Sequence, residues 1–470
     1  MNGLPLICGD DVRAPLAWRA GQPISRGQYL ADVQALASRL PEAGPMLNLT
    51  ADRYRFAVGL GAAMLRGQHN LLPPNHTSDT VARLLEQFPG TYALADAGAP
   101  AVRLPTHLHP MYPMDHAPLA EPPRIADHAL AAQVLTSGST GAPQPHPKHW
   151  GLLVRNAQGG AQRLAQQIGR QSLAGVTIVA TVPAQHMYGF ESSVLVALVG
   201  GAAFDTERPF YPADIVAALT RAAPPRVLVT TPFHLKMLLE SGLALPPVDL
   251  VVSATAPLSP QLAARAESAL GGALMEIYGC TEAGQVASRR TTAGPEWRVY
   301  EGLRLSGDGD QAVVQGGHVP QPTVLADVLE VLDAQTFRLL GRSNDLVNMA
   351  GKRSSLSHLN HHLNTIAGVQ DGVFWLPHLA ENDAKTGNET DSETVSDAGG
   401  VVRLVAFVVA PGIAHQSIVA ALRAKVDAAF LPRRLVDVAS LPREATGKLP
   451  AAVLDAWAPQ QLALARRGAS

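Results

Sequence analysis

The sequence predicts an α/β fold: a large N-terminal domain of parallel-rich sheets with crossover helices, plus a small mobile α+β C-terminal domain. Short runs rich in β-branched residues, typical of buried strands, alternate with longer segments of helical periodicity. A further helix is expected to begin at Ser259 and Pro260, a hydroxyl cap with proline in the first turn, and to end at Gly271. The predicted strands are residues 176–182, 226–230 and 248–252, and one predicted helix is residues 213–222.

Length and local composition predict two domains, residues 1–341 and residues 342–470. The chain has 470 residues, more than one hydrophobic core usually serves. Beyond Gly341 the sequence restarts with a polar segment, followed by a predicted helix at 357–366 and a predicted strand at 401–409. Residues 381–400 are acidic, polar and glycine-rich, which indicates an exposed, mobile loop.

The bulk composition excludes several classes of protein. Hydrophobic residues make up 47% of the chain and charged residues 16%, which is typical of a well-buried globular protein. The net charge of −2 gives no reason to expect nucleic acid or an anionic membrane as a partner. Cys8 and Cys280 are too few for a disulfide framework. With no signal peptide and no apolar run of spanning length, we expect a cytoplasmic protein without a membrane span.

The most informative motif is a loop of hydroxyl and glycine residues directly after a predicted strand at 130–135. Glycines permit a close backbone approach, and hydroxyl and N–H groups donate to phosphate oxygens, so the loop is a candidate anion site. It lacks the Gly-Lys-Ser/Thr of the common P-loop, and a plain surface turn is the alternative interpretation. The loop consists of Thr136, Ser137, Gly138, Ser139, Thr140 and Gly141.

Three later segments give this loop a context. They are residues 278–282 (Tyr-Gly-Cys-Thr-Glu), 341–345 (Gly-Arg-Ser-Asn-Asp) and 442–448 (Pro-Arg-Glu-Ala-Thr-Gly-Lys). In this order the four motifs resemble those of the acyl-adenylate-forming, AMP-binding superfamily. That superfamily includes acyl- and aryl-CoA synthetases, the adenylation domains of peptide synthetases and luciferase-like ligases. The resemblance extends from Thr136 to Lys448.

The resemblance implies that the hydroxyl-glycine loop holds the β- and γ-phosphates of ATP. The customary lysine of this motif is replaced by Gln144, and Lys148, four residues later, is the candidate for the missing cation. The turn Ala254, Thr255 and Ala256 is similar to the family's glycine-rich turn at the adenine and acid pocket. Asp327 and Arg342 match the two contacts to the ribose.

The segment 278–282 implies the next group of nucleotide contacts. By resemblance, Tyr278 lies against adenine beside Gly279, Thr281 bonds the α-phosphate and Glu282 holds Mg²⁺. Chemistry supports the last role, because a hard divalent cation prefers carboxylate oxygen together with phosphates and water. The alternative is that Glu282 merely begins a helix near its positive dipole end.

His186 matches the histidine that acid-activating relatives place beside the substrate carboxylate; a core histidine is the alternative. Small and apolar residues near it leave room for a flat ring. The predicted acid pocket comprises His186, Met187, Tyr188, Gly189, Ala254, Gly279 and Cys280.

The C-terminal domain is implied to deliver the catalytic lysine. Lys448 would meet the negative charge that develops during adenylation, and the alternative is a solvated surface lysine. With it, the predicted catalytic residues are His186 and Thr281. Gly351 resembles the glycine that admits a pantetheine arm, although a plain turn explains it as well. Either Asn344 or Asp345 is the hinge between domains.

The implied reaction has two halves. A carboxylic acid attacks MgATP to give an acyl-adenylate, and a thiol of CoA or of a carrier protein's phosphopantetheine then accepts the acyl group. The short N-terminal part and the Gln-Pro-His-Pro-Lys continuation resemble ligases of bacterial aryl-polyene pigment clusters, which implies an aryl acid such as a hydroxybenzoate. The alternatives are a fatty or short-chain acyl-CoA synthetase and a nucleotide-binding regulatory protein without turnover. The sequence leaves the acceptor, the acid and the oligomeric state open.

Overall fold

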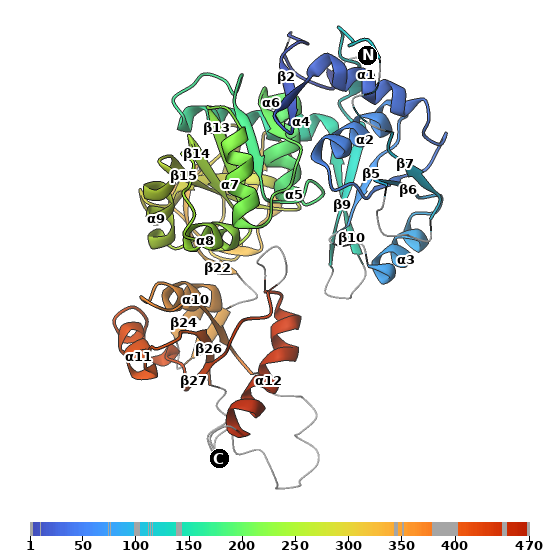
Figure 1. The fold of residues 1–470 in the computed structure, drawn as a ribbon. Coiled ribbons are helices and arrows are strands. Elements are labelled where there is room, and N and C mark those ends of the chain that lie inside the picture. The colour runs from blue at the N-terminus through green and yellow to red at the C-terminus, as the bar shows by residue number, and fades with distance from the viewer. Residues whose placement is uncertain are drawn as a thin grey trace.

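The computed structural model has the predicted α/β architecture (Figure 1). Strands in the described part of the chain form two large sheets and four small ones. The structure describes residues 3–9, 11–73, 75, 77–97, 104–110, 112, 114, 116–137, 143–342, 346–349, 352–377, 403–443 and 449–467. The predicted loop at 381–400 therefore lies outside the described residues.

The first large sheet has six strands in the order β10-β9-β5-β4-β6-β7. All neighbours are parallel except β9 and β10, which form an antiparallel hairpin at one edge. The strands are β4 (Met46–Asn48), β5 (Asn70–Leu72), β6 (Tyr92–Ala95), β7 (Thr106–Leu108), β9 (Leu130–Ser137) and β10 (Pro143–His149). The helices in this part of the chain are α1 (Arg26–Ala37), α2 (Arg53–Leu65) and α3 (Ser78–Gln87).

The second large sheet has eleven strands in the order β21-β22-β17-β16-β15-β14-β13-β11-β12-β2-β3. Six central strands, from β15 to β2, are parallel, and antiparallel strands extend both edges. They are β2 (Pro15–Arg19), β3 (Gln22–Ser25), β11 (Thr177–Ala180), β12 (Ala203–Asp205), β13 (Arg226–Thr230), β14 (Leu250–Ser253), β15 (Ala273–Cys280), β16 (Gly284–Arg290), β17 (Glu296–Val299), β21 (Asp327–Val331) and β22 (Thr336–Arg342).

The helices that connect the second sheet follow the predicted pattern. The Ser259 hydroxyl accepts a hydrogen bond from the Leu262 N–H and caps the following helix, which ends at Gly271 with φ of 77°. Around the acid-pocket segment a short α-turn continues into a π-helical turn, η1, a rare form that is frequent at functional sites. The elements are α4 (Trp150–Gln167), α5 (Met187–Gly189), η1 (Phe190–Leu195), α6 (Val196–Gly200), α7 (Pro212–Arg221), α8 (Pro232–Glu240) and α9 (Pro260–Leu270).

The two large sheets share one core. A single hydrophobic cluster contains Met46 from the first sheet and Val227 from the second. The fully buried Arg53 links the same two bodies, because its guanidinium donates to Ser193 Oγ at 2.7 Å and to the carbonyl oxygen of Ala180 at 2.9 Å. Arg53, the first residue of α2, is thereby held at the end of β11.

The strand β10 is the largest departure from the sequence-based expectation, because its Pro-rich sequence gave no strand signal. Prolines occupy every second position, at 143, 145 and 147, on an edge strand. On an edge strand alternate N–H groups point away from the neighbour, so prolines with this spacing leave the ladder intact. The intervening residues Gln144, His146 and Lys148 consequently share one face of the strand.

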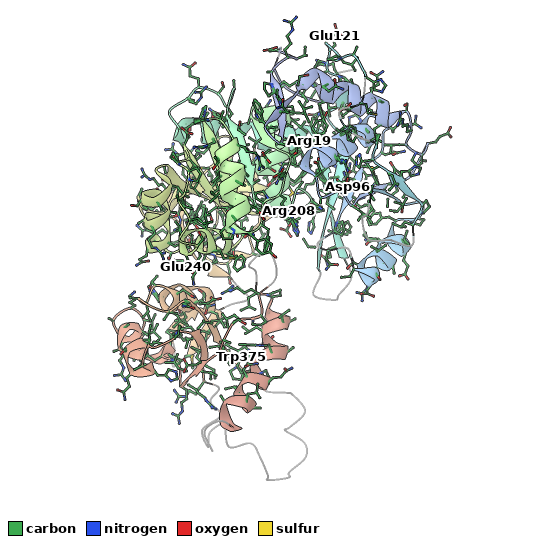
Figure 2. All side chains as sticks on the ribbon, in the orientation of Figure 1. Arg19, Asp96, Glu121, Arg208, Glu240 and Trp375 are labelled. Carbon is green, nitrogen blue, oxygen red and sulfur yellow. The ribbon has the colours of Figure 1, made fainter. Side chains whose placement is uncertain are left out.

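The C-terminal part forms a separate body below β22 (Figure 1). Its two hydrophobic clusters contain only residues from Val347 onward. Within it Trp375 (Figure 2) donates from Nε1 to Asp455 Oδ1 at 2.8 Å, which joins β25 to α12. Its elements are β23 (Leu346–Met349), β24 (Lys352–Ser355), α10 (Leu356–Asn364), β25 (Asp371–Trp375), β26 (Val405–Val409), α11 (His415–Arg423), η3 (Ala428–Phe430), β27 (Arg434–Asp437) and α12 (Ala451–Arg467).

The remaining elements are small sheets on the large body. They are the pair β1 (Gly3–Pro5) and β8 (Arg124–Ala126), and the meander β18 (Leu303–Ser306), β19 (Val313–Gly316) and β20 (Val319–Val324). In the described ranges no helix combines the length and apolar character that crossing a bilayer requires.

Candidate active site

The β9–β10 hairpin brings the start of the hydroxyl-glycine loop to the edge of the first sheet. Thr136 and Ser137 are the last residues of β9, and Thr136 Oγ1 lies 3.0 Å from Nε2 of His146 on β10. The other predicted loop residues, Gly138, Ser139, Thr140 and Gly141, lie outside the described residues.

The turn between β15 and β16 carries the other half of the predicted phosphate site. Thr281 and Glu282 lie in this turn, and the Lys148 ammonium donates to the carbonyl oxygens of both residues, at 3.4 Å in the case of Glu282. His146 Nε2 lies 3.9 Å from Glu282 Oε1. The hairpin with the hydroxyls and the turn with the glutamate are therefore direct neighbours, although more than 130 residues separate Lys148 from Thr281.

The surroundings of Glu282 fit a magnesium ligand. Its side chain is 51% exposed, and no helix begins at this residue, so the helix-start alternative is wrong. Over the described ranges no group of three or more His, Cys, Asp or Glu side chains gathers to hold a metal. A single exposed carboxylate suits Mg²⁺, which completes its shell with phosphates and water.

The predicted adenine and ribose residues meet across the second large sheet, although β15 and β21 are not adjacent strands. The Tyr278 hydroxyl, near the end of β15, donates to Asp327 Oδ2 on β21 at 2.8 Å. The backbone of Asp327 pairs with that of Arg342 on β22. The Tyr278 ring packs edge-on against Trp297 and Phe337, which fixes its plane. These contacts gather three residues that the sequence spreads over more than sixty positions.

The acid-pocket segment is fixed by close packing. His186 is the half-buried N-cap residue of α5, and Met187, Tyr188 and Gly189 form that turn. The Tyr188 hydroxyl donates to the carbonyl oxygens of Thr230 and Val252, at 3.0 and 2.9 Å, at the ends of β13 and β14. A Cβ on Gly189 would collide with the Pro183 carbonyl oxygen, so only glycine fits there.

The turn after β14 contains a strained residue. Thr255 has φ of +80°, in the left-handed region that costs a β-branched residue conformational energy. Its Oγ1 is buried and has no hydrogen-bond partner in the part of the chain that is described. Ala254 and Ala256 flank it in the turn. Strain and an unpartnered hydroxyl in one turn are features that functional sites concentrate.

Two neighbours of Thr281 have limited freedom. A Cβ on Gly279 would collide with the Gly284 carbonyl oxygen, which explains the glycine. Burial raises the pKa of the Cys280 thiol to about 12, so this thiol stays protonated and is not a nucleophile at neutral pH.

No role was predicted for Glu191, a buried carboxylate that lies on η1 and is 3% exposed. It accepts hydrogen bonds from the Asn156 amide and from the Gln285 backbone N–H. Burial raises the pKa of Glu191 to about 7, opposed by the positive charge of Lys148. Burial likewise lowers the pKa of Lys148, and the charge of Glu191 opposes that shift. A charged residue inside the apolar run at 187–199 was the one available signal.

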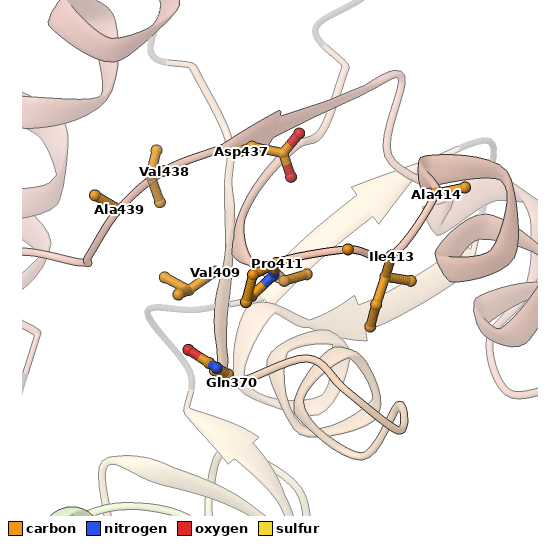
Figure 3. Close-up of a pocket in the computed structure, with 10 residues that line it drawn as sticks. Gln370, Val409, Pro411, Ile413, Ala414, Asp437, Val438 and Ala439 are labelled. Carbon is orange, nitrogen blue, oxygen red and sulfur yellow. The ribbon is translucent and has the colours of Figure 1, made fainter.

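The C-terminal predictions fall largely outside the described residues, namely Gly351, Lys448 and the hinge candidates Asn344 and Asp345. The first two residues of the motif 442–448 are described, and Arg443 forms a two-pronged ion pair with Asp371, at 2.7 and 2.8 Å. A shallow depression of about 560 Å³ on this body (Figure 3) shares no residue with the predicted site. Its lining is mainly Gln370, Asp437 and the segment 409–414.

Comparison with known proteins identifies the family. The model of the AMP-binding enzyme family matches residues 49–339. A 4-coumarate–CoA ligase of Rhodobacter capsulatus is 29% identical over 306 residues, 65% of this chain and 70% of the relative. One from Halorhodospira halophila is 29% identical over 255 residues, 52% of this chain and 60% of the relative.

Solved structures share the fold over nearly the whole chain. The anthranilate CoA ligase AuaEII, in complex with anthranoyl-AMP, aligns with a TM-score of 0.75 and 16% identity over 98% of this chain and 99% of its own. ATP-bound MatB from Rhodopseudomonas palustris aligns with a TM-score of 0.74 and 18% identity over 96% of this chain and 97% of its own. With the family match covering more than half of its length, this chain belongs to the AMP-binding enzyme family and is an AMP-forming acid–thiol ligase.

Proposed function

We propose that the protein activates an aryl carboxylic acid with MgATP and transfers the acyl group to the thiol of CoA or of a carrier protein's phosphopantetheine. The observation that carries this proposal is the contact between the β9–β10 hairpin and the Thr281–Glu282 turn. It joins the described part of the hydroxyl loop, Thr136 and Ser137, to an exposed carboxylate that suits Mg²⁺. The reaction uses ATP and a free thiol carrier, and we propose the cytoplasm as its location.

Each residue then has a role in the first half-reaction. A substrate carboxylate oxygen attacks the α-phosphorus, and the bond to the β-phosphate breaks to release pyrophosphate. Thr281 donates to the α-phosphate, Glu282 holds Mg²⁺, and Lys448 meets the charge that develops in the transition state. Magnesium, when bound, neutralises phosphate charge. Tyr278, Asp327 and Arg342 hold the adenosine.

In the second half-reaction a thiol sulfur attacks the acyl carbon, and the bond from this carbon to AMP breaks. The thiol proton leaves to solvent or to the departing phosphate. His186 and Gly351 would line the approach of the carboxylate and of the pantetheine arm. This order lets one mixed anhydride carry the energy of ATP into the thioester.

The aryl assignment is supported by the size and chemistry of the pocket segments. Gly189, Ala254 and Gly279 are small residues in the segments that the resemblance assigns to the acid pocket. Two of the similar proteins are named for aromatic acids, 4-coumarate and anthranilate. Together with the resemblance to aryl-polyene ligases, these features favour a hydroxybenzoate or a related acid.

The test is ATP–pyrophosphate exchange over a panel of hydroxybenzoic, cinnamic, fatty and short-chain acids. We expect exchange to be fastest with a hydroxylated aryl acid. Faster exchange with a fatty or short-chain acid would assign the enzyme to that class instead, and absence of exchange with every acid would favour a nucleotide-binding regulator. Parallel transfer assays with CoA and with a phosphopantetheinylated carrier protein identify the acceptor.

A further inference from the structure

The buried ammonium of Lys148 carries a role that its position in the sequence does not suggest. Lys148 occupies the face of β10 that also bears Gln144 and His146, and it is only 8% exposed. Its Nζ donates to the carbonyl oxygens of Thr281 and Glu282. An ammonium so far removed from water needs such oxygen partners, because its dehydration is costly. The contact therefore specifies one backbone conformation of the turn.

The other end of the same turn is held by Glu191. This carboxylate accepts the backbone N–H of Gln285 and the amide of Asn156. Gly284 has φ of +76°, and a Cβ there would come within 2.8 Å of Glu191 Oε1 and 2.6 Å of the Asn156 amide nitrogen. The turn is thus packed between the buried Lys148 ammonium at its start and the buried Glu191 carboxyl group at its end.

We propose that Lys148 is a positioning residue, which fixes the Thr281–Glu282 turn through its backbone and so aims the glutamate at the metal, rather than a cation that contacts the phosphates. The proposal rests on the magnesium role proposed for Glu282. It explains how a chain with Gln144 at the customary lysine position still uses a nearby lysine: Lys148 links the hairpin to the metal-binding turn. His146, between Thr136 and Glu282, lies on the same face and completes that link.

The two roles differ in their dependence on magnesium. A cation that touches phosphate binds ATP whether or not Mg²⁺ is present, whereas a residue that orients the metal ligand matters only when Mg²⁺ is bound. Calorimetric titration with ATP in excess chelator measures the affinity for ATP without Mg²⁺, which reports a direct contact with the phosphates. The Mg²⁺ concentration at half-maximal effect, measured both on ATP affinity and on the rate of pyrophosphate exchange, reports the orientation of the metal ligand.

The variants are Lys148→Met, the doubly neutral Lys148→Met/Glu191→Gln, Glu282→Gln, and Lys236→Met on α8 as a control. The double variant is needed because removing Lys148 alone leaves a buried, unpaired carboxylate, whereas a neutral pair of similar volume is tolerated better. A thermal melt confirms that each variant folds. In the double variant we expect the Mg²⁺ concentration at half-maximal effect to rise about tenfold, as happens when a residue that orients a metal ligand is removed. The affinity for ATP in excess chelator should stay within a factor of about two of that of the parent protein.

If the double variant loses about tenfold in ATP affinity both in excess chelator and with Mg²⁺, the proposal is overturned and Lys148 is assigned to the phosphates. An unshifted Mg²⁺ midpoint in the double variant, with a shifted one in Glu282→Gln, would overturn it as well. If Glu282→Gln itself leaves the midpoint unchanged, the metal role of Glu282 fails first, and the proposal built on it is overturned with it. Failure of the parent protein to exchange pyrophosphate would instead count against the proposed reaction.

Discussion

The Tyr278 hydroxyl donates a hydrogen bond to Asp327 Oδ2 at 2.8 Å. It joins the end of β15 to the start of β21, two strands that are not neighbours in the sheet. The aromatic residue expected against adenine and the carboxylate expected at the ribose are therefore one unit. Because Tyr278 also packs against Trp297 and Phe337, the position of the carboxylate depends on an aromatic cluster.

Replacing Tyr278 with Phe keeps the ring and removes this hydrogen bond. A hydrogen bond to a charged group contributes about 1.5–3 kcal/mol, so we expect KM for ATP to rise about tenfold. KM for the acid should stay the same, because Asp327 is directed at the nucleotide. Tyr211→Phe, at an exposed position, serves as the control. Equal changes in both KM values would argue against a specific nucleotide role.

The ion pair of Arg443 with Asp371 holds Arg443, five residues before Lys448, against the start of β25. We expect Lys448→Ala to slow adenylation by about a hundredfold or more and to leave transfer from a supplied acyl-adenylate largely intact. Arg443→Ala should slow the same half-reaction by about tenfold to a hundredfold, because it loosens the approach of the lysine.

The double variant Arg443→Ala/Lys448→Ala should be no slower than Lys448→Ala alone, since the arginine acts through the lysine. Arg423→Ala on α11 is the matched control on the same body. Single-turnover measurements of both half-reactions separate the two steps. An additive loss in the double variant, or equal loss in both half-reactions, contradicts this assignment.

The titration of Glu191 should make the free energy of unfolding depend on pH. Burial raises the pKa of this carboxyl from 4.5 to about 7, so the folded protein holds a proton that the unfolded chain releases. Its contribution to stability is therefore complete below pH 4.5 and is lost as pH rises through about 7. The shift corresponds to about 3 kcal/mol.

Glu191→Gln removes that dependence while keeping a hydrogen-bond acceptor for Gln285. The stability of the variant relative to the parent should rise by most of this amount between pH 5 and pH 8, by about 1.4 kcal/mol for each unit of pKa shift. Urea unfolding at several pH values measures it. Parallel curves for the two proteins would show that Glu191 is not the titrating group.

Replacing Thr255 with glycine should destabilise the protein less than the same replacement at most other threonines. Its left-handed conformation costs about 1–3 kcal/mol, and glycine releases that strain at an entropic cost of about 0.5–1 kcal/mol. We expect Thr255→Gly to leave the free energy of unfolding unchanged or to raise it by about 1 kcal/mol. Thr220→Gly, in the last turn of α7, should instead destabilise the protein, because it removes the hydroxyl hydrogen bond to the Val216 carbonyl oxygen and adds the entropic cost of glycine. Destabilisation of both variants to the same degree would exclude strain at Thr255.

Local signals in the sequence predicted the fold well. The cap at Ser259 and the glycine at Gly271 gave the bounds of α9, and the run 226–230 gave those of β13. The strand 176–182 is shorter than expected, as β11 covers only Thr177–Ala180. The strand β10 was missed because proline is usually a strand breaker, and only edge placement with the right alternation makes it compatible.

The candidate site was predictable where a motif is contiguous and unpredictable where it depends on long-range contacts. The segments around Thr136 and Glu282 are contiguous motifs that the resemblance assigns to one nucleotide, and the structure brings them together. The contact of Lys148 with the turn at Thr281 depends on how two sheets pack, which no local pattern encodes. The same holds for Glu191, whose burial follows from the assembly of η1 against α4 and β16.

We propose that one site gathers the hydroxyl loop after β9, the Glu282 carboxylate and the triphosphate of ATP. The decisive experiment is a crystal structure with Mg²⁺ and a non-hydrolysable ATP analogue. We expect a metal about 2.1 Å from a Glu282 oxygen and from phosphate oxygens, with the β- and γ-phosphates against residues 136–141. A triphosphate bound elsewhere, with Glu282 and Thr136 both facing only solvent, would contradict it.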